Sequence, residues 1–514
     1  MNSVKLTNQI SILCILAFVL LPSNYLAQIQ QEISWPTLFN SQSPMIHVNP
    51  QSNGRTKVKG PQAGHIKWIR DMPNGIFNGP VVGPKDNLYF GSYYVGFQPP
   101  HGESFYSYTS NGSLLWEFIT AESSTPNGAI LIDSDTTIYF TCIADSLLYA
   151  LYPNGDLKWK INLGGYPFQL GIINIDLMGN LYLAIRNSYL LCINKDGNIN
   201  WSYYLGNNYT SHEALSPTFA PDGKTIYISG LDSNLFALNL DGTLKWTYSC
   251  GKNYSIQMVD SDGNIYIVST EPTTTLESIS PEGILRWDYT ILNHSFNDLS
   301  SFAMDKEGNI YLGFIVYIIS FDYYGNFRWQ YNFSQGEEIR QPLICDTEGT
   351  IYCGSSHGNF YYAISCDGEL IWKVPLNEWQ ADNTTAFGTT GTLYIGLHKG
   401  IWYANQVQTL LAISDDTTTS IHVNYSNLSF KLNQNYPNPF NPYTNISFEI
   451  PTKGFTTLEV YNTLGQRVSV LVDELRESGT YEEHFNSSDL PSGTYFCKLQ
   501  SGNLVSVKKM ILLK

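Results

Sequence analysis

The segment Leu148–Trp159, with the sequence LYALYPNGDLKW, sets the pattern of most of this chain. Variants recur at Leu235–Trp246 (LFALNLDGTLKW) and Tyr361–Trp372 (YYAISCDGELIW). Their shared core, Gly-x-x-x-Trp, occurs eight times and ends at Trp68, Trp116, Trp159, Trp201, Trp246, Trp287, Trp329 and Trp372. Successive tryptophans are 48, 43, 42, 45, 41, 42 and 43 residues apart. A period of about 40–45 residues with strand-like contents indicates a radial β-repeat.

A second landmark in each unit is a small residue followed by Ile or Leu, then Tyr, then an apolar residue. The eight tyrosines are Tyr89, Tyr139, Tyr182, Tyr227, Tyr266, Tyr311, Tyr352 and Tyr394. A turn rich in Asp and Gly usually precedes the tyrosine, as at Asp260–Gly263, and its Gly or Asn supplies the positive φ of a tight hairpin. Each unit therefore predicts four antiparallel strands, and the chain predicts an all-β fold of propeller blades.

The counting of strands predicts how the ring closes. The strand Gly64–Arg70 has no partner strands before it, and the last unit, Thr384–Asn405, has three strands but no Gly-x-x-x-Trp strand. We expect Gly64–Arg70 to complete the last unit, which gives an eight-bladed propeller over residues 64–405 with no unpaired edge at the seam. A seven-bladed ring with a frayed end is the alternative. Val95–Glu103 is an insertion in the first blade.

The repeats of Gly64–Asn405 resemble those of the pyrroloquinoline-quinone-like (quinoprotein alcohol dehydrogenase-like) propellers. The residues that carry the resemblance are Ala150…Gly155…Trp159, Ala237…Gly242…Trp246 and Ala363…Gly368…Trp372, with the lead-in Trp35-Pro36…Gly54-Arg55…Gly60-Pro61-Gln62. The resemblance implies that the eight periodic tryptophans form a tryptophan-docking motif, in which each indole packs between neighbouring blades. It leaves function open, because the family includes both quinone-dependent enzymes and non-catalytic scaffolds.

The N-terminal region predicts export. Residues 1–27 are interpreted as a secretory signal peptide, with Lys5 near the start, the apolar run Ile10–Leu21 and cleavage after Ala27. A retained anchor is the alternative, although the run is short for a membrane span. Residues 28–63 form a polar lead-in that we expect to be extended on the surface of the propeller. Seven cysteines remain after signal removal, and their irregular spacing favours buried thiols over a disulfide framework.

The C-terminal region predicts a second domain. Residues 406–429, with a polar centre at Asp415–Ser420, are expected to be a linker. Residues 430–514 then alternate short strands with turns, which suggests a small β-sandwich of the immunoglobulin-like type. The strands are expected at Thr444–Ile450, Thr457–Asn462, Gln466–Val472, Gly479–Asn486, Gly493–Gln500 and Val505–Leu513.

This second domain resembles the type A C-terminal sorting domain of the type IX secretion system. The resemblance is carried by Asn435–Pro442, by Leu458–Asn462 with Leu464-Gly465-Gln466, by Leu490–Tyr495 and by Lys508–Lys514. The motif residues are Asn435, Pro437, Pro439, Gly465, Gly493 and Lys509. The resemblance implies passage through the periplasm, handling by the type IX machinery, and release from the cell or attachment to its outer surface.

Charge and short motifs limit the chemistry. The net charge of −16 disfavours binding to nucleic acid and to anionic membrane surfaces.

Asp260–Asn264 resembles the start of a calcium loop, but a strand follows it, so we interpret it as a hairpin turn. Gly354–Gly358 spells Gly-x-Ser-x-Gly around Ser356, yet it links two strands, whereas a nucleophile elbow links a strand to a helix. The sequence contains no recognisable metal-binding motif, phosphate-binding loop or set of catalytic residues. The off-period residues Trp35, Trp379 and Trp402 are the better ligand-facing candidates.

The sequence therefore favours a secreted or surface-attached, monomeric propeller that binds an extracellular glycan or protein without catalysis, cofactor or metal. Two alternatives stay open. One is a dehydrogenase that uses pyrroloquinoline quinone, although the adjacent cysteines and long insertions of the catalytic relatives are missing. The other is a hydrolase or lyase that acts on extracellular polysaccharide, because propellers can carry such sites on loops.

Overall fold

The computed structural model describes residues 28–514 apart from 73–74, 94–103, 121–125, 127, 143–145, 165–171, 186–187, 207–215, 231–232, 251–256, 270–272, 292–298, 358–359, 377–378, 382–383, 399–407, 417–420, 424–429, 451–453, 477–478 and 502–503. The predicted signal peptide, the insertion Val95–Glu103 and Trp402 lie outside these ranges. The regular structure of the described residues is β-strand apart from one short 3-10 turn, as the repeated tyrosine and tryptophan landmarks predicted.

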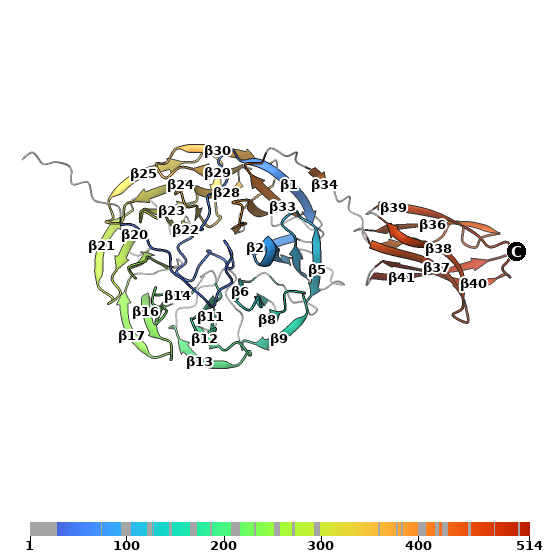
Figure 1. Ribbon diagram of the computed structural model, residues 1–514, viewed down its shortest axis with the longest axis horizontal. Helices are drawn as coiled ribbons and strands as arrows, with labels where there is room; N and C mark the ends of the chain where they lie inside the picture. Colours follow the sequence, from blue (N-terminus) through green and yellow to red (C-terminus); the bar gives the residue numbers. More distant parts are fainter. Residues whose placement is uncertain are drawn as a thin grey trace, which may run out of the picture.

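Eight small sheets are arranged as a ring in Figure 1, counted over the described residues. Their innermost strands are β2 (Gly75–Val82), β6 (Ile130–Ile132), β10 (Asn174–Ile175), β14 (Thr218–Phe219), β18 (Met258–Val259), β22 (Leu299–Met304), β27 (Ile344–Cys345) and β31 (Thr385–Phe387). The second strands, which carry the periodic tyrosines, are β3 (Leu88–Tyr93), β7 (Ile138–Cys142), β11 (Leu181–Ile185), β15 (Thr225–Ser229), β19 (Ile265–Ser269), β23 (Ile310–Phe314), β28 (Ile351–His357) and β32 (Leu393–Leu397).

The two remaining strands of each sheet face outward. The third strands are β4 (Ser104–Tyr108), β8 (Leu147–Leu151), β12 (Tyr189–Ile193), β16 (Asn234–Asn239), β20 (Thr275–Ile279), β24 (Tyr317–Phe321), β29 (Phe360–Ile364) and β33 (Gln408–Ser414). The outer strands, which carry the periodic tryptophans, are β5 (Leu114–Ile119), β9 (Leu157–Asn162), β13 (Ile199–Tyr204), β17 (Leu244–Ser249), β21 (Leu285–Thr290), β25 (Phe327–Asn332), β30 (Leu370–Pro375) and β1 (His65–Met72). A short 3-10 turn, η1 (Pro84–Asp86), joins β2 to β3, and β26 (Glu338–Ile339) pairs with β28.

Burial explains the two residue patterns. The second strands, buried along most of their length, tolerate continuous apolar runs, whereas outer strands such as β9 alternate between exposed and half-buried residues. In five sheets the buried tyrosine donates its hydroxyl to the aspartate six residues earlier, at the turn between the first and second strands. The pairs are Tyr139–Asp133 (2.8 Å), Tyr182–Asp176 (2.9 Å), Tyr266–Asp260 (2.9 Å), Tyr311–Asp305 (2.6 Å) and Tyr352–Asp346 (3.1 Å).

The last sheet joins the two ends of the ring. Its order is β31-β32-β33-β1-β34, and β1 pairs antiparallel with β33, from Met72 opposite Gln408 to His65 opposite Ser414. The short strand β34 (Ile421–Val423) adds to the free edge of β1 in parallel register. The N-terminal strand therefore completes the sheet of the last repeat unit.

These pairings correct the predicted boundaries. The third strand of the last unit is Gln408–Ser414, so the ring does not end at residue 405 and the linker does not begin at 406. Part of the predicted linker is structural, because Asp415 Oδ1 accepts the backbone N–H groups of Gln62 (2.6 Å) and Ala63 (2.8 Å). The prediction that residues 28–63 lie on the surface is also wrong, as the burial of Met45 and Gln51 to 1 % exposure already indicates.

Replacing Asp415 by alanine should lower the free energy of unfolding by about 1 kcal/mol, because two backbone N–H groups at the seam lose their acceptor. Asp416→Ala is the matched control. Its carboxylate makes an exposed ion pair with Lys67 (3.2 Å), so its loss should change stability by about 0.5 kcal/mol or less. Chemical denaturation of both variants measures the difference. Equal effects would contradict a seam contact at Asp415.

The C-terminal region forms two further sheets around one core. The three-stranded sheet has the order β35 (Lys431–Leu432), β36 (Tyr443–Ile450), β39 (Gly479–Asn486). The four-stranded sheet has the order β38 (Arg467–Arg476), β37 (Gly454–Asn462), β40 (Gly493–Ser501), β41 (Leu504–Leu512). Phe448, Leu458, Leu499 and Leu512 from the two sheets share a single apolar cluster. All six predicted strands are present, with shifted ends at some.

Candidate functional site

The axis of the ring is lined by the innermost strands, and each presents one equivalent backbone amide. The amide belongs to the last residue before the turn that leads to the second strand. The eight residues are Val82, Ile132, Ile175, Phe219, Val259, Met304, Cys345 and Phe387. An innermost strand has a partner strand on one side only, so a buried N–H group on its other side needs an acceptor at the axis.

The lead-in supplies these acceptors. Six of the amides donate to main-chain carbonyl groups of Ser43–Gly54, the axial segment. The bonds are Val82 to Ser43 (2.7 Å), Ile132 to Pro44 (2.9 Å), Phe219 to Pro50 (3.0 Å), Val259 to Gln51 (3.0 Å), Met304 to Asn53 (2.9 Å) and Cys345 to Gly54 (2.9 Å). The acceptor residues follow one another along the axial segment in the same order as the sheets follow one another around the ring. The axial segment therefore runs around the inside of the ring.

The two other amides are satisfied through side chains. The Phe387 N–H donates to Ser43 Oγ (2.9 Å), which links the last sheet to the residue that also contacts the first. The Ile175 N–H donates to the Asn174 side-chain oxygen (2.9 Å), and Asn174 Nδ2 in turn donates to the Pro50 carbonyl (2.9 Å). Every one of the eight equivalent positions is thus hydrogen-bonded, and all eight sheets contact the same short stretch of chain directly or through Asn174.

The axial segment is buried and turns sharply. His47, Val48 and Ser52 have positive φ angles of 61°, 73° and 52°. Gly54 has φ +63°, and a Cβ there would lie 2.9 Å from the Leu343 carbonyl oxygen, so a side chain does not fit. Burial lowers the pKa of His47 to about 4, which keeps the imidazole neutral near pH 7. The segment therefore places no charge on the axis.

The first part of the lead-in crosses the turns between the first and second strands. Gln30 N–H donates to the Lys306 carbonyl (2.7 Å), and Thr37 Oγ1 donates to the Asp176 carbonyl (2.6 Å). Trp35, one of the three off-period candidates for facing a ligand, is 8 % exposed. Its indole N–H donates to the Ile175 carbonyl (2.8 Å), and its ring packs on Phe219. The other described off-period tryptophan, Trp379, is half-buried against the core of the last sheets.

The eight periodic tryptophans make one repeated contact. Each indole N–H donates to a carbonyl of the next repeat along the chain, and the last reaches the residues before the first strand. The pairs are Trp68–Ser110 (3.1 Å), Trp116–Pro153 (2.9 Å), Trp159–Lys195 (2.9 Å), Trp201–Leu240 (2.9 Å), Trp246–Pro281 (2.9 Å), Trp287–Tyr323 (3.2 Å), Trp329–Cys366 (2.8 Å) and Trp372–Pro61 (2.9 Å).

The glycine of Gly-x-x-x-Trp receives the indole of the preceding repeat. At seven positions a Cβ on the glycine would lie 2.5–3.2 Å from an indole carbon, for example at Gly368 against Trp329 and at Gly64 against Trp372. Gly112 differs, because the Arg70 side chain covers it and stacks its guanidinium over Trp68 at 5.4 Å. The fixed spacing of Gly and Trp thus reflects contact between neighbouring sheets.

The motifs weighed for catalysis and metal binding lie in structural roles. Ser356 is within β28, 1 % exposed, and its hydroxyl donates to the Glu338 carbonyl (3.1 Å). Asp260 caps its own turn by accepting the N–H groups of Asp262 (2.9 Å) and Asn264 (2.8 Å), and burial raises its pKa. Within the described ranges, no three His, Cys, Asp or Glu side chains gather as metal ligands, and six of the seven cysteines are buried. No helix in these ranges has the length and apolarity to span a membrane.

The predicted sorting-motif residues hold the edges of the C-terminal domain. Asn435, 2 % exposed, donates to the Pro437 carbonyl (3.0 Å) and to Thr444 Oγ1 (3.0 Å). Pro439 precedes Phe440, whose N–H donates to the Ile511 carbonyl (3.0 Å), and the Lys509 carbonyl accepts from Gln434 (2.7 Å). Gly493 begins β40 opposite Leu512. The proline-rich entry is therefore fastened to the last strand of the chain.

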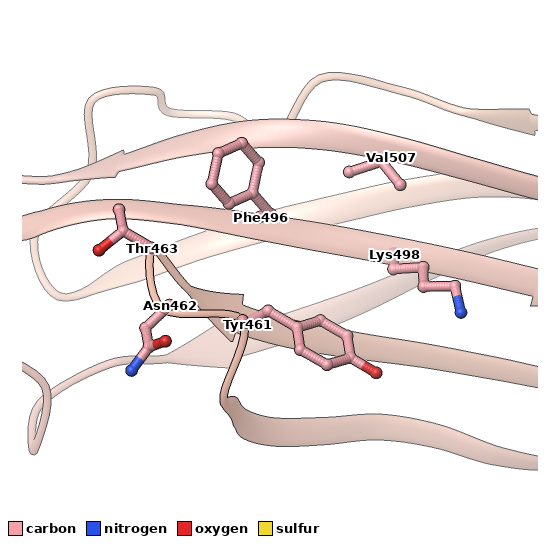
Figure 2. Close-up of a pocket in the computed structure, with 7 residues that line it drawn as sticks. Tyr461, Asn462, Thr463, Phe496, Lys498 and Val507 are labelled. Carbon is pink, nitrogen blue, oxygen red and sulfur yellow. The ribbon is translucent and has the colours of Figure 1, made fainter.

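A pocket of about 430 Å³ lies on the outer face of the four-stranded sheet in this domain. Figure 2 shows Tyr461, Phe496, Lys498 and Val507 lining it beside the turn at Asn462 and Thr463. Gly465, the fourth motif position, closes that turn with φ +75°. The pocket thus brings a motif residue next to two aromatic rings and one ammonium group.

The ring of antiparallel sheets defines the main part of the chain as a β-propeller, and solved structures share it. The match to BamB from Moraxella catarrhalis covers 68 % of this chain and 100 % of the BamB chain, with a TM-score of 0.53 and 13 % sequence identity. The match to the Dos1 propeller covers 68 % of this chain and 95 % of the Dos1 propeller chain, with a TM-score of 0.55 and 11 % sequence identity. At such identity the likeness concerns the fold alone. No curated protein matches the chain significantly in sequence.

The C-terminal domain is assigned by its sequence. Residues 434–513 match the family described as the secretion system C-terminal sorting domain. The chain therefore combines a β-propeller with a type IX secretion sorting domain, as its sequence had indicated. Such a domain sends its cargo to the cell surface or the extracellular space.

Proposed function

We propose that this protein is a non-catalytic, eight-bladed propeller that binds a glycan or protein outside the cell as a monomer. Eight blades are supported by the eight equivalent amides at the axis and by the cyclic order of the tryptophan contacts, in which Trp372 reaches Pro61. We interpret these contacts as tryptophan docking. We interpret the two facing C-terminal sheets as an immunoglobulin-like sandwich that serves export.

The observation that carries the proposal is the filled axis. Catalytic members of the family that the repeats resemble hold their quinone above the centre of the ring. Here the chain's own lead-in occupies the axis, with Met45, Gln51 and Ser52 each 1 % exposed. The lead-in also covers turns of one face, through Gln30 and Thr37. This arrangement favours recognition at the remaining outer surface over chemistry at the centre.

The test is a titration of the whole purified protein with pyrroloquinoline quinone and calcium, followed by tryptophan fluorescence and by dye-linked alcohol oxidation. We expect neither saturable quenching nor turnover, because a cofactor cannot enter without displacing the axial segment. Parallel incubation with extracellular polysaccharides should release no new reducing or unsaturated ends. Saturable quenching with turnover, or cleavage of a polysaccharide, would replace the proposal with an enzyme.

A further inference from the structure

At the axis, the innermost strands (the wall) recognise the axial segment (the occupant) mainly through its main-chain carbonyl groups. Six wall amides donate to six main-chain carbonyl oxygens at 2.7–3.0 Å. By contrast, three buried polar atoms of the occupant, His47 Nδ1, Gln51 Nε2 and Ser52 Oγ, have no hydrogen-bond partner among the described residues. The polar complementarity between the innermost strands and the axial segment therefore resides mainly in the peptide groups, while Met45, Ile46 and Val48 add apolar packing.

We propose that the axial channel is a peptide-binding site, and that residues Ser43–Gly54 are its ligand, held in cis. The ligand class is an irregular peptide whose carbonyl groups point outward around a circle. This inference does not depend on the proposed function, since a peptide site at the axis is compatible with a ligand or a substrate elsewhere.

Two side-chain requirements define the specificity of the site. Position 43 must offer a side-chain acceptor to the Phe387 N–H, which Ser43 Oγ does at 2.9 Å. Position 54 must be glycine, because its φ is +63° and a Cβ would approach the Leu343 carbonyl oxygen to 2.9 Å. Asn53 adds an internal brace, since its Oδ1 accepts from Asn49 Nδ2 (2.6 Å) and from the Arg55 N–H (3.1 Å).

The site also explains how the ring can be held from inside. Without the peptide, six N–H groups of the innermost strands would lose their protein acceptors, which would weaken these strands in six sheets at once. Several of the innermost strands are only two residues long, for example β14 and β18. The bound peptide therefore adds to strand pairing in ordering the inner wall.

The experiment uses the full chain with a site-specific protease sequence inserted between Lys57 and Val58, where the Lys57 side chain is 44 % exposed. After cleavage, the peptide that ends at Lys57 has no covalent link to the ring and is held by non-covalent contacts, those of the axial segment and those of Gln30, Trp35 and Thr37. We expect it to co-elute with the ring on native gel filtration and to separate only when the ring unfolds. An excess of labelled peptide of residues 28–57 should enter the cut protein slowly and remain bound. Loss of the peptide from a ring that keeps its fold would overturn the proposal.

Point variants of the cut protein test the specificity. Gly54→Val should shorten the half-life of the bound peptide at least tenfold, and Ser43→Ala should shorten it measurably. Asn40→Ala is the matched control, because Asn40 is exposed and lies in the same peptide. An equal half-life for all three variants would overturn the proposal.

A second measurement covers the case in which the inserted or cut protein does not fold. In the uncut chain, the amides of Val82, Ile132, Phe219, Val259, Met304 and Cys345 should exchange with solvent only through global unfolding. Gly54→Val should accelerate the exchange of these six at least tenfold over Asn40→Ala. Exchange that is fast in the unsubstituted protein, or unaffected by Gly54→Val, would overturn the proposal.

Discussion

The protein should unfold cooperatively in alkali, at about pH 11, because its eight periodic tyrosines cannot ionise in place. All eight side chains are at most 2 % exposed, and burial raises the pKa of each above the ordinary 10.0. In most of them a nearby aspartate raises the pKa further, as Asp305 does for Tyr311.

The sign of the pH dependence follows from these directions. A raised folded-state pKa means that the folded protein keeps protons that the unfolded chain releases above pH 10, so stability is complete below pH 10 and falls above it. Each tyrosine removes about 1.4 kcal/mol per pH unit, so eight remove roughly 11 kcal/mol, which is comparable to the total stability of a domain.

Phenolate absorbance and near-ultraviolet circular dichroism, recorded together across an alkaline titration, measure this effect. We expect a large part of the absorbance change to coincide with loss of the dichroism signal in one steep transition. Tyr311→Phe is the informative variant, since it removes one titrating group and should make the fall in stability shallower by about one proton. Gradual ionisation of all tyrosines around pH 10 in a protein that stays folded would contradict the burial of the repeat.

Trp372→Ala should be the most damaging single substitution at the seam, with a loss of about 3–5 kcal/mol in the free energy of unfolding. The indole is 9 % exposed, packs on Gly64 and lies near Tyr352 and Tyr361, at centroid distances of 5.9 and 6.4 Å. Its N–H also donates to the Pro61 carbonyl (2.9 Å), so the residue joins the last full repeat to the start of the chain.

Two controls separate packing from general effects of truncation. Trp372→Phe keeps an aromatic ring and removes the N–H donor, so a smaller loss is expected, nearer the 1 kcal/mol of one hydrogen bond. Phe327→Ala removes an aromatic ring that is 50 % exposed on an outer strand, and should cost less than about 1 kcal/mol. Chemical denaturation gives all three values. A loss at Trp372 no larger than that at Phe327 would argue against a role at the seam.

The strands of the ring could be predicted because their signals are local. The tyrosine strand is buried, the tryptophan strand is amphipathic, and a glycine turn lies between Leu148–Leu151 and Leu157–Asn162. The spare strand Gly64–Arg70 could be assigned to the last unit by counting alone. The third strand of that unit was predicted before residue 405 but is Gln408–Ser414. It was misplaced because no tryptophan marks it, and its sequence QTLLAIS was assigned to the linker.

The axial site could not be predicted from composition. Residues 28–63 are polar and rich in Pro, Asn, Ser and Gln, which normally indicates exposed chain. Their burial depends on carbonyl groups, which every sequence possesses, accepting from amides that six distant strands bring together. The available signal was indirect: the inner strands present N–H groups toward the axis, and the lead-in was a segment without a strand assignment. Trp35, a candidate for facing a ligand, is likewise buried against the turns that the lead-in crosses.

The pairing of β1 with β33 sets a waiting time during synthesis. Met72 and Gln408 are partners although 336 residues separate them (408 − 72), so β1 emerges from the ribosome long before its neighbour exists. At roughly 5–20 residues per second, that interval is about 17–67 s. Throughout it, the edge of β1 that later pairs with β33 is open to pairing with another chain. A holding factor, or folding delayed until β33 is present, would protect this edge, and the sorting domain follows β33 in the chain.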